Sequence, residues 1–198
     1  MIRIKTGCIL IGWLVLVFSA CISSSEIFDS YGYKMTPVGT GGYILAEKKM
    51  ADGKELERGF VRKNKKEGTW TTYHHDRDLI QYVTGYLNGQ LNGTHLEFNE
   101  NGNLVKEENY LNGVLHGAQT RYAFSRIVSQ ATYKMGKFDG TYKEYNDRGQ
   151  LQRRVDFKDG KEHGYLRYYD AEGKVTIEYF YQNGERISGG MVEDNEEN

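Results

Sequence analysis

A glycine-patterned unit recurs along most of this chain and constrains its fold more than any other feature. In the clearest copy, Phe157 to Lys174, an aromatic residue lies three positions before a first glycine, and a second glycine follows four positions after the first. Successive copies are 23 to 25 residues apart. Such a fixed period is typical of repeat proteins. The glycines of the two positions are Gly68, Gly89, Gly93, Gly113, Gly117, Gly136, Gly140, Gly160, Gly164 and Gly184.

The residues at these glycines predict turns. Most first glycines follow Asn or Asp, as in Asn88-Gly89 and Asp159-Gly160, and both residue types tolerate the positive φ of tight hairpin turns. Asn64 replaces the first glycine in the earliest copy, and Gly189 comes one residue late in the last. A third glycine ends a polar turn in three copies, at Gly102, Gly149 and Gly173. Arg77 and Arg126 take this position in the other two copies, where we expect looser or longer turns.

The segments between the turns have strand character. Aromatic and β-branched residues alternate with polar ones, as in Val175 to Tyr181. Two ladders run through the copies, aromatic at every position except Val61, and packing within the sheet is the favoured explanation for both. One ladder is Val61, Tyr86, Tyr110, Tyr133, Phe157 and Tyr181, and the other is Tyr73, Phe98, Tyr122, Tyr145 and Tyr169. The chain has a single proline, which suits continuous sheet pairing.

The predicted fold is therefore all-β. We expect residues 53–190 to form about six hairpin units of about 24 residues, stacked as one elongated, twisted antiparallel meander. About eleven or twelve strands at roughly 4.8 Å spacing would span about 50–60 Å.

The repeat pattern closely resembles the MORN-repeat variant of bacterial proteins often labelled YwqK-like antitoxins. Tyr110–Tyr122 carries the pattern Y-x-N-G-x-x-H-G-x-x-x-x-Y at every fixed position, and Phe157–Tyr169 carries it with Phe and Asp substitutions. The resemblance covers roughly residues 54–190 and implies a scaffold or binding module. One departure is the tryptophan frequent two residues after the second glycine, which is present here only as Trp70; His95, Gln119, Tyr142 and Leu166 replace it.

The N-terminus predicts export and lipid anchoring. Residues 1–20 combine Arg3 and Lys5 with an apolar run from Cys8 to Phe18, which is too short to span a membrane. The ending Phe18-Ser19-Ala20-Cys21 resembles a bacterial lipobox, with lipid attached to Cys21. This predicts a protein anchored at the bacterial cell envelope, in a leaflet that the sequence does not specify. A plain secreted protein or an uncleaved anchor is the alternative.

The remaining segments outside the repeats are short. Residues 21–30 are predicted to be a tether, and residues 31–52 either a capping strand or a degenerate first hairpin, because an open sheet edge needs a cap. Residues 191–198 form an acidic tail.

Composition argues against several functions. Once Cys8 leaves with the signal and Cys21 carries lipid, the mature chain has no free thiol for a disulfide or a metal. Without Arg3 and Lys5, 24 basic and 27 acidic residues remain, a net charge of −3, so no basic face indicates nucleic-acid binding. The cluster Lys63, Lys65 and Lys66 is interpreted as a solvated turn rather than a site for an acidic ligand.

No residue pattern predicts an enzyme, a metal site or a cofactor. His116 and His163 share one repeat position, just before the second glycine, so we interpret them as structural residues that hydrogen-bond a turn amide. His74-His75-Asp76 is a weak candidate for a metal, since adjacent side chains point apart. Gly39 to Gly42 lack the Gly-Lys-Ser/Thr ending of a phosphate loop. Ser125 and Ser129 lack the Gly-x-Ser-x-Gly motif of a nucleophile elbow.

The predicted function is a membrane-tethered scaffold that binds a protein partner at the cell envelope. Exposed aromatic side chains would form the interface. Two alternatives remain: binding of a glycan or lipid through the aromatic ladders, and an antitoxin or immunity role against an exported toxin. The candidate binding residues are Trp70, Tyr73, Phe98, Tyr122, Tyr142, Tyr145 and Tyr169.

Overall fold

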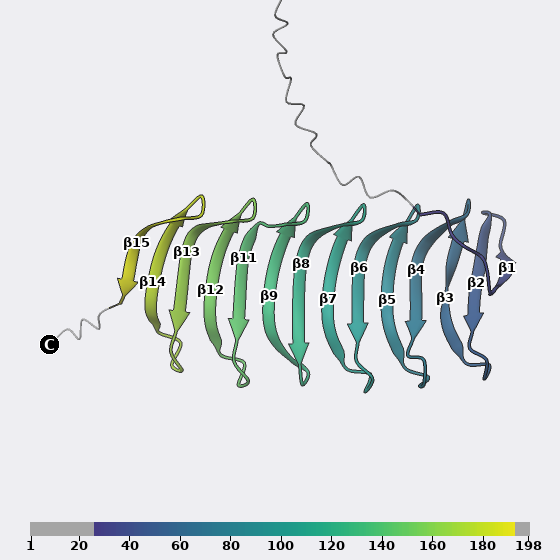
Figure 1. Ribbon diagram of the computed structural model, residues 1–198, viewed down its shortest axis with the longest axis horizontal. Coiled ribbons are helices and arrows are strands. Elements are labelled where there is room, and N and C mark those ends of the chain that lie inside the picture. Colours follow the sequence, from purple (N-terminus) through teal and green to yellow (C-terminus); the bar gives the residue numbers. More distant parts are fainter. Residues whose placement is uncertain (1–25, 193–198) are drawn as a thin grey trace, which may run out of the picture.

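A computed structural model describes residues 26–192 of the chain. These residues form one antiparallel sheet (Figure 1), in which consecutive strands pair along the order β1 to β9 and then β11 to β15. The short strand β10 pairs with β9 and leads directly into β11. The strands are β1 (Tyr33–Val38), β2 (Tyr43–Lys49), β3 (Glu55–Arg62), β4 (Lys65–Tyr73), β5 (Ile80–Leu87), β6 (Gln90–Phe98), β7 (Leu104–Leu111), β8 (Val114–Ala123), β9 (Arg126–Lys134), β10 (Lys137–Phe138), β11 (Gly140–Tyr145), β12 (Leu151–Lys158), β13 (Lys161–Tyr169), β14 (Val175–Gln182) and β15 (Glu185–Met191).

This architecture confirms the predicted all-β meander of hairpin repeats. Each strand pairs with its neighbours in sequence, and the sheet does not close on itself because β1 and β15 stay unpaired on their outer sides. Residues 31–52 form the hairpin of β1 and β2, which pairs with β3 and adds two strands to the predicted number.

The first-glycine positions all lie in tight turns along one long edge of the sheet, which we call the short-turn edge. Both turn residues have positive φ, for example 52° at Asn88 and 82° at Gly89, as two-residue hairpins of type I′ require. Lys63-Asn64 and Met135-Gly136 adopt the same conformation with less suitable residues. The turns are Lys63-Asn64, Asn88-Gly89, Asn112-Gly113, Met135-Gly136, Asp159-Gly160 and Asn183-Gly184.

The other long edge, the long-turn edge, carries the loops that end at the third glycine. Residues 99–103, 146–150 and 170–174 form these loops, and Gly102, Gly149 and Gly173 have positive φ as predicted. The loop with Arg77 is one residue longer, as expected, and spans residues 74–79.

The prediction for the turn before Arg126 is wrong. Phe124 and Ser125 both take positive φ, 51° and 61°, and close a two-residue turn that is the shortest on this edge. Pairing of Ala123 with Arg126 continues the ladder up to the turn. The copy without the third glycine therefore has a shorter turn than the others, not a looser or longer one, because Phe124 and Ser125 both adopt the left-handed conformation.

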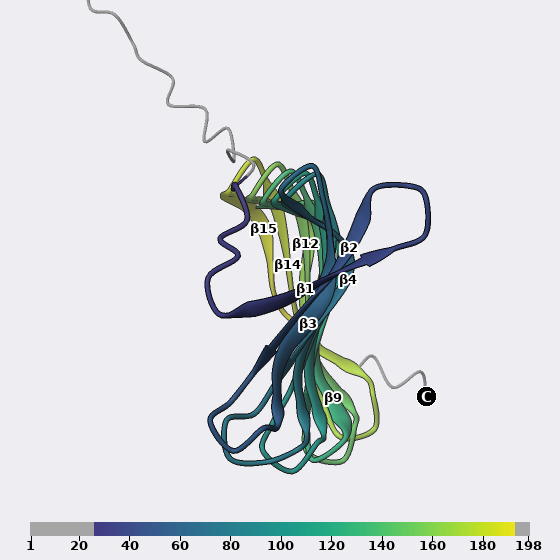
Figure 2. The ribbon, with the colours of Figure 1, turned by 90° about the vertical axis from the view of Figure 1, so that its right-hand side faces the viewer.

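The prediction that the second glycines lie in turns is wrong: they lie in strands, mostly at bulges that bend them, because a bulge takes up the positive φ of the glycine within the ladder. Between β5 and β6, Thr84 pairs with His95 and Tyr86 with Leu91, so Gly85 faces three residues around Gly93. Gly93 has a φ of 84°. An end view shows the strands curving between the two edges (Figure 2). Bulges of this kind raise strand bend and twist locally.

Register defines two faces of the sheet, because directly paired residues point to the same side. The face that bears Trp70, which we call the Trp70 face, has a buried central row. Pairing links Trp70 to Thr84, then to His95, Glu108, Gln119 and Ala131, and separately links Tyr142 to Val155, Leu166 and Tyr179. Aromatic packing follows the same face, since Phe138 stacks on Tyr133 at 4.6 Å and on Phe157 at 5.0 Å between ring centroids.

Residues 26–32 cross the Trp70 face at its N-terminal end, and we call them the N-terminal segment. Figure 2 shows this dark segment on one side of the curved sheet. Phe28 is buried with Ala46, Val61 and Trp70 in an apolar cluster. The predicted tether of residues 21–30 is therefore wrong for 26–30, because burial of Phe28 holds this part on the sheet. Residues 1–25, with the predicted signal and Cys21, and residues 193–198 lie outside the described residues.

Candidate functional site

Trp70 is a core residue and not part of a binding surface. Only 1% of its surface is exposed, and its Nε1 donates a hydrogen bond to the Phe60 carbonyl at 2.9 Å. The Phe28 ring lies 5.4 Å from the Trp70 ring between centroids. The prediction that Trp70 binds a partner is wrong, because the N-terminal segment covers the end of the face on which Trp70 lies.

Lys66 is also part of this packed end of the sheet. Its Nζ lies 4.0 Å from the centre of the Trp70 ring and 2.6 Å from Glu57 Oε1. The Tyr33 hydroxyl donates to the second Glu57 oxygen. Burial, with the hydrogen bond to Glu57, raises the pKa of Tyr33 well above its ordinary value. The solvated-turn interpretation is thus wrong for Lys66, although Lys63 is exposed in its turn.

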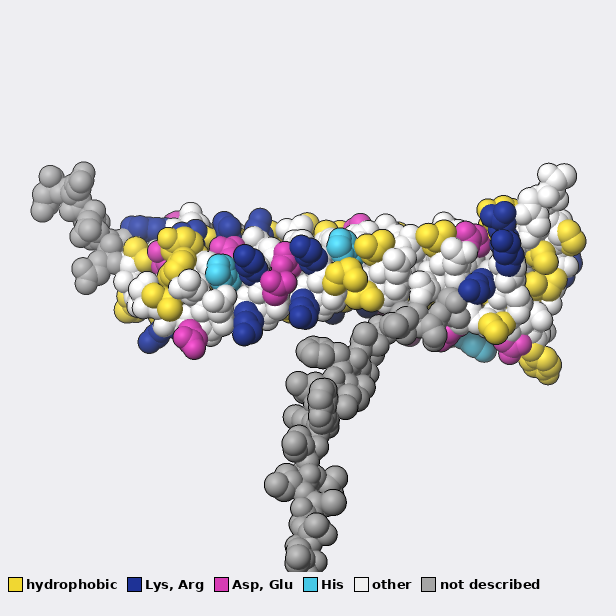
Figure 3. All heavy atoms as spheres, turned by 90° about the horizontal axis from the view of Figure 1, so that it is seen from above, with side chains coloured by type: hydrophobic (Ala, Val, Ile, Leu, Met, Phe, Trp, Pro, Cys, Tyr) yellow, Lys and Arg dark blue, Asp and Glu magenta, His cyan; other side chains and the backbone are white. Residues whose placement is uncertain are grey.

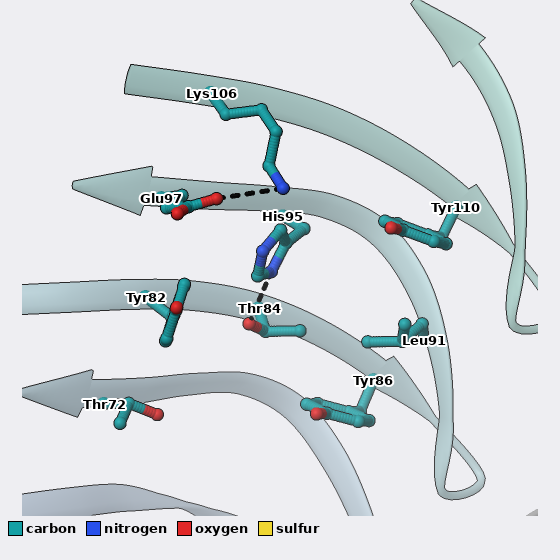
Figure 4. Close-up of a pocket in the computed structure, with 9 residues that line it drawn as sticks. All are labelled: Thr72, Tyr82, Thr84, Tyr86, Leu91, His95, Glu97, Lys106 and Tyr110. Carbon is teal, nitrogen blue, oxygen red and sulfur yellow. Dashed lines mark hydrogen bonds and ion pairs between the residues drawn. The ribbon is translucent and has the colours of Figure 1, made fainter. Parts of the chain in front are cut away.

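A hollow of about 400 Å³ opens on the Trp70 face beside this cluster (Figure 4). Strands β4 to β7 supply its lining, because side chains two residues apart on a strand share a face. Aromatic rings, a histidine and an ion pair surround the hollow. The lining residues are Thr72, Tyr82, Thr84, Tyr86, Leu91, His95, Glu97, Lys106 and Tyr110.

His95 lies at the centre of the hollow. Its ring stacks on Tyr82 at 5.5 Å between centroids, and its Nδ1 lies 2.9 Å from Thr84 Oγ1. Burial lowers the pKa of His95, and the charge of Glu108 only partly opposes this effect. The imidazole is therefore neutral near pH 7, which suits hydrogen bonding more than ionic contact.

Two charged side chains, Glu97 and Lys106, line the hollow, and Glu108 lies beside it. Lys106 Nζ lies 2.9 Å from Glu97 and 3.5 Å from Glu108. Burial opposes the charge of Lys106, but the hydrogen bond to Glu97 and the charge of Glu108 raise its pKa overall. Glu108 also accepts hydrogen bonds from the Tyr110 hydroxyl at 2.9 Å and from Gln119 Nε2 at 2.7 Å. Burial and the bond to Glu108 raise the pKa of Tyr110 to about 12.

Tyr142 lies on the same Trp70 face, farther along the sheet. Its hydroxyl donates to Glu144 at 2.7 Å, and burial with this bond raises its pKa to about 12. The two candidate residues at the same repeat position, Trp70 and Tyr142, thus share a face but not a site.

The other five candidates form a row on the opposite face, near the long-turn edge, which we call the aromatic row. The hydroxyls of Tyr122 and Tyr145 lie 3.5 Å from Glu107 and 2.9 Å from Gln130. Both of these residues pair with Thr120, which follows Gln119 on β8 and therefore points to the face opposite Trp70. All five side chains are half-buried. A bulge beside each aromatic residue pairs it with an aliphatic one, which widens the apolar strip. The pairs are Tyr73 with Ile80, Phe98 with Leu104, Tyr122 with Ile127, Tyr145 with Leu151, and Tyr169 with Val175.

The repeat position of His116 and His163 serves turn structure. His163 Nδ1 accepts a hydrogen bond from the Asn183 amide at 3.4 Å, in the turn of the next repeat. Glu67, Asn92 and Asp139 accept equivalent bonds from Asn88, Asn112 and Asp159 at 2.9, 3.3 and 3.2 Å. The predicted side-chain bond to a turn amide is confirmed for these positions. His116 differs, because its buried Nδ1 has no partner among the described residues.

The other sequence candidates lie apart from both surfaces. His74 is buried in the 74–79 loop, and its Nε2 lies 3.1 Å from the Phe98 carbonyl, whereas His75 and Asp76 are exposed. Within residues 26–192, no His, Cys, Asp and Glu side chains gather in a group of three that could hold a metal ion. The same residues contain no helix long and apolar enough to cross a membrane.

Sequence reasoning missed most of the hollow. Tyr86 and Tyr110 belonged to a predicted ladder, but Thr84, Glu97 and Lys106 carry no repeat signal. Glu97 shares strand parity with His95, but Thr84 and Lys106 lie on the neighbouring strands, so only the register between strands groups them with His95.

Comparison with known proteins supports the repeat interpretation. Three segments, residues 91–112, 138–159 and 162–183, match the MORN repeat variant. Each begins just after one short turn and ends within the next. A comparison with curated proteins finds no match to the chain. Among solved structures, a crystal structure of a mutant S. aureus TarM in complex with fondaparinux, alpha-GlcNAc-glycerol and UDP is similar at a TM-score of 0.31 and 10% identity. That similarity covers 60% of this chain and 21% of the other, and at this TM-score it carries no argument.

Proposed function

We propose that this chain, which contains repeats of the MORN variant, is a lipid-anchored scaffold that binds a protein partner at the bacterial cell envelope. The observation that carries the proposal is the aromatic row of Tyr73, Phe98, Tyr122, Tyr145 and Tyr169. The lipobox-like sequence before Cys21 supports the anchor.

The aromatic row has the features of a protein interface. It repeats once every two strands, which is about 9.6 Å along the sheet, and it lies on the face that the N-terminal segment leaves uncovered. Tyrosine and phenylalanine are enriched in the centres of protein interfaces, where polar rims surround them. An extended strip of this kind fits an elongated partner segment better than a small molecule.

Affinity capture with the tagged full-length protein from detergent-solubilised membranes tests the partner. We expect one stoichiometric protein partner with the parent chain and its loss with Tyr122→Ser/Tyr145→Ser. Tyr168→Ser is the matched control, because Tyr168 is 37% exposed but lies on the Trp70 face. Retention of every captured protein by the double variant would contradict binding through the aromatic row.

The anchor has its own test. Cys21→Ser should move the protein out of the membrane fraction, and the N-terminal peptide of the parent should carry the mass of the acyl chains. Stable anchoring needs more than one acyl chain, so the mass of the N-terminal peptide should correspond to at least two chains. Unchanged fractionation of Cys21→Ser would contradict the anchor while leaving the aromatic row untouched.

The hollow on the Trp70 face favours a second function, binding of a saccharide unit. Ring faces and edges from Tyr82 and Tyr110, the neutral His95 and the Glu97–Lys106 pair offer both apolar and polar contacts to a sugar. Titration with peptidoglycan or capsule fragments should show binding that His95→Ala weakens. Absence of binding up to about 1 mM, a free energy of about −4 kcal/mol, would remove this candidate.

A further inference from the structure

The two long edges of the sheet differ in charge. Charged residues are compared in each turn or loop between positions 50 and 184, together with the one residue on either side of it. The six turns of the short-turn edge then carry seven Lys or Arg and two Asp or Glu, and the carboxylates of Glu67 and Asp139 also bond amides of these turns. The loops of the long-turn edge carry six Lys or Arg and eight Asp or Glu. The acidic sequence 193–198 follows Val192, whose amide bonds Thr176 at the long-turn edge.

The short-turn edge also exposes large apolar side chains between its basic groups. Leu87, Leu111 and Met135 are 44%, 40% and 58% exposed, at or beside successive turns. Figure 3 looks onto this edge and shows dark blue and yellow side chains spread along it, with magenta acidic side chains among them. The basic residues flank the apolar ones on both sides; they are Arg62, Lys63, Lys65, Lys134, Lys137, Lys158 and Lys161.

The described chain also begins at this edge. The Phe28 amide donates to the Asn64 carbonyl at 2.9 Å, in the first short turn. The Glu26 carbonyl oxygen lies beside the next turn, 2.8 Å from where a β-carbon on Gly89 would be. Glu26 is five positions after Cys21, and a fully extended chain over five positions reaches at most about 18 Å. A lipid on Cys21 would therefore hold the short-turn edge near the membrane.

We propose that the short-turn edge lies on the surface of the membrane that holds the anchor. The lysines contact anionic phospholipid headgroups, and Leu87, Leu111 and Met135 enter the interfacial layer. This inference rests on the proposed lipid anchor, but it adds an orientation that an anchor alone does not impose. Basic side chains are attracted to an anionic lipid surface, and apolar side chains between them strengthen the binding when they are buried in the interfacial layer. The strands then stand away from the membrane.

One consequence concerns the partner. Strand β9 has nine residues and spans about 30 Å from one edge to the other. The aromatic row near the long-turn edge would stand at this order of distance from the lipid surface, where a partner can reach it without displacing lipid.

The two ends of β9 provide a matched pair of probes. Phe124 precedes β9 at the long-turn edge, and Met135 follows it at the short-turn edge. Both are exposed, at 98% and 58%, and both have positive φ in two-residue turns, 51° and 49°. A mature chain with acylated Cys21 has no other cysteine, so Phe124→Cys or Met135→Cys can be labelled selectively.

The experiment uses the full-length acylated protein in phosphatidylglycerol vesicles, with a fluorophore on either cysteine and a quencher on the lipid headgroups. We expect strong quenching of the label at position 135 and little at position 124. Equal quenching, or stronger quenching at position 124, would overturn the orientation. Flotation with the vesicles and the acylated N-terminal mass are measured first, so that a missing anchor is recognised as a failure of the proposed function.

Charge reversal tests the contact with headgroups. Lys137→Glu/Lys161→Glu, introduced with Met135→Cys, should cause loss of most of the quenching at position 135. In vesicles of neutral phosphatidylcholine, the Met135→Cys chain without the lysine changes should also lose most of the quenching at position 135. Unchanged quenching in the double variant would overturn the role of the lysines.

Discussion

Gly59 has no room for a side chain, although its φ lies outside the left-handed region. A β-carbon there would come within 2.2 Å of the Trp70 ring, which the N-terminal segment and the sheet hold in place. We expect Gly59→Ala to lower the free energy of unfolding by about 3 kcal/mol, at the upper end of overpacking effects. Urea unfolding measures this change. Gly190→Ala is the control, because a β-carbon there meets nothing within 4 Å and its φ is not positive; equal stability of both variants would contradict the packing.

His95 should make the stability depend on pH. Burial lowers its pKa in the folded state below the ordinary value of 6.5. Between these two pKa values the unfolded chain binds more protons, so stability falls as the pH drops through that window. Below the folded pKa the loss is complete. Lys106 opposes the imidazolium, whereas Glu97 and Glu108 favour it.

Thermal unfolding from about pH 8 to about pH 5 measures this effect against His95→Gln, which keeps a polar group near Thr84 but does not titrate. The parent should lose more stability than the variant on acidification. Parallel profiles would show that His95 does not control this window.

Among the strands and turns, His116 marks the one position where the inter-repeat bond to a turn amide is missing. Its buried Nδ1 has no partner among the described residues, whereas the other residues at this position accept a bond from the next turn. His116→Asn copies Asn92 and should accept from the Met135 amide. We expect a gain of about 0.5–1.5 kcal/mol, the net value of one hydrogen bond. His163→Asn is the control and should be near neutral; a loss of stability in His116→Asn would contradict this reading of the repeat.

Hairpins and turns could be predicted from the sequence because their physics is local. Asn-Gly pairs fix type I′ turns, so twelve strands of the main order from β3 to β15 follow from the spacing of the turns. The bulges at the second glycines were not predicted, because a glycine with positive φ suits a turn and a bulge equally well. The turn at Phe124-Ser125 could not be predicted, because nothing in either residue favours positive φ. The ladder imposes that conformation from both flanking strands.

Across the whole molecule, contacts between segments far apart in sequence decided what the repeat pattern left open. Trp70 resembled an exposed ligand contact, but its burial depends on Phe28, which lies 42 residues earlier. The hollow likewise depends on register across four strands. Strand parity predicted that the aromatic row lies on the face opposite Trp70. Parity did not predict the aliphatic partners, because bulges bring them beside the row.

The N-terminal segment should stabilise only its own end of the sheet. Phe28 is 7% exposed and contacts Trp70 and Tyr33, with ring centroids 5.4 and 4.9 Å apart. Phe28→Ala should cost about 3–5 kcal/mol of local stability, as for a buried aromatic side chain. Ile27→Ala is the control, since Ile27 is 74% exposed and such changes usually stay within about 0.5 kcal/mol.

Hydrogen exchange can locate this effect along the molecule. Repeat arrays couple mainly through nearest neighbours, so Phe28→Ala should speed amide exchange in β1 to β4 and leave β12 to β15 unchanged. Emission from Trp70 should shift to longer wavelength as water reaches the ring. Equal acceleration in β12 to β15 would mean that the sheet unfolds as one cooperative unit, in which the N-terminal end sets the stability of the whole sheet.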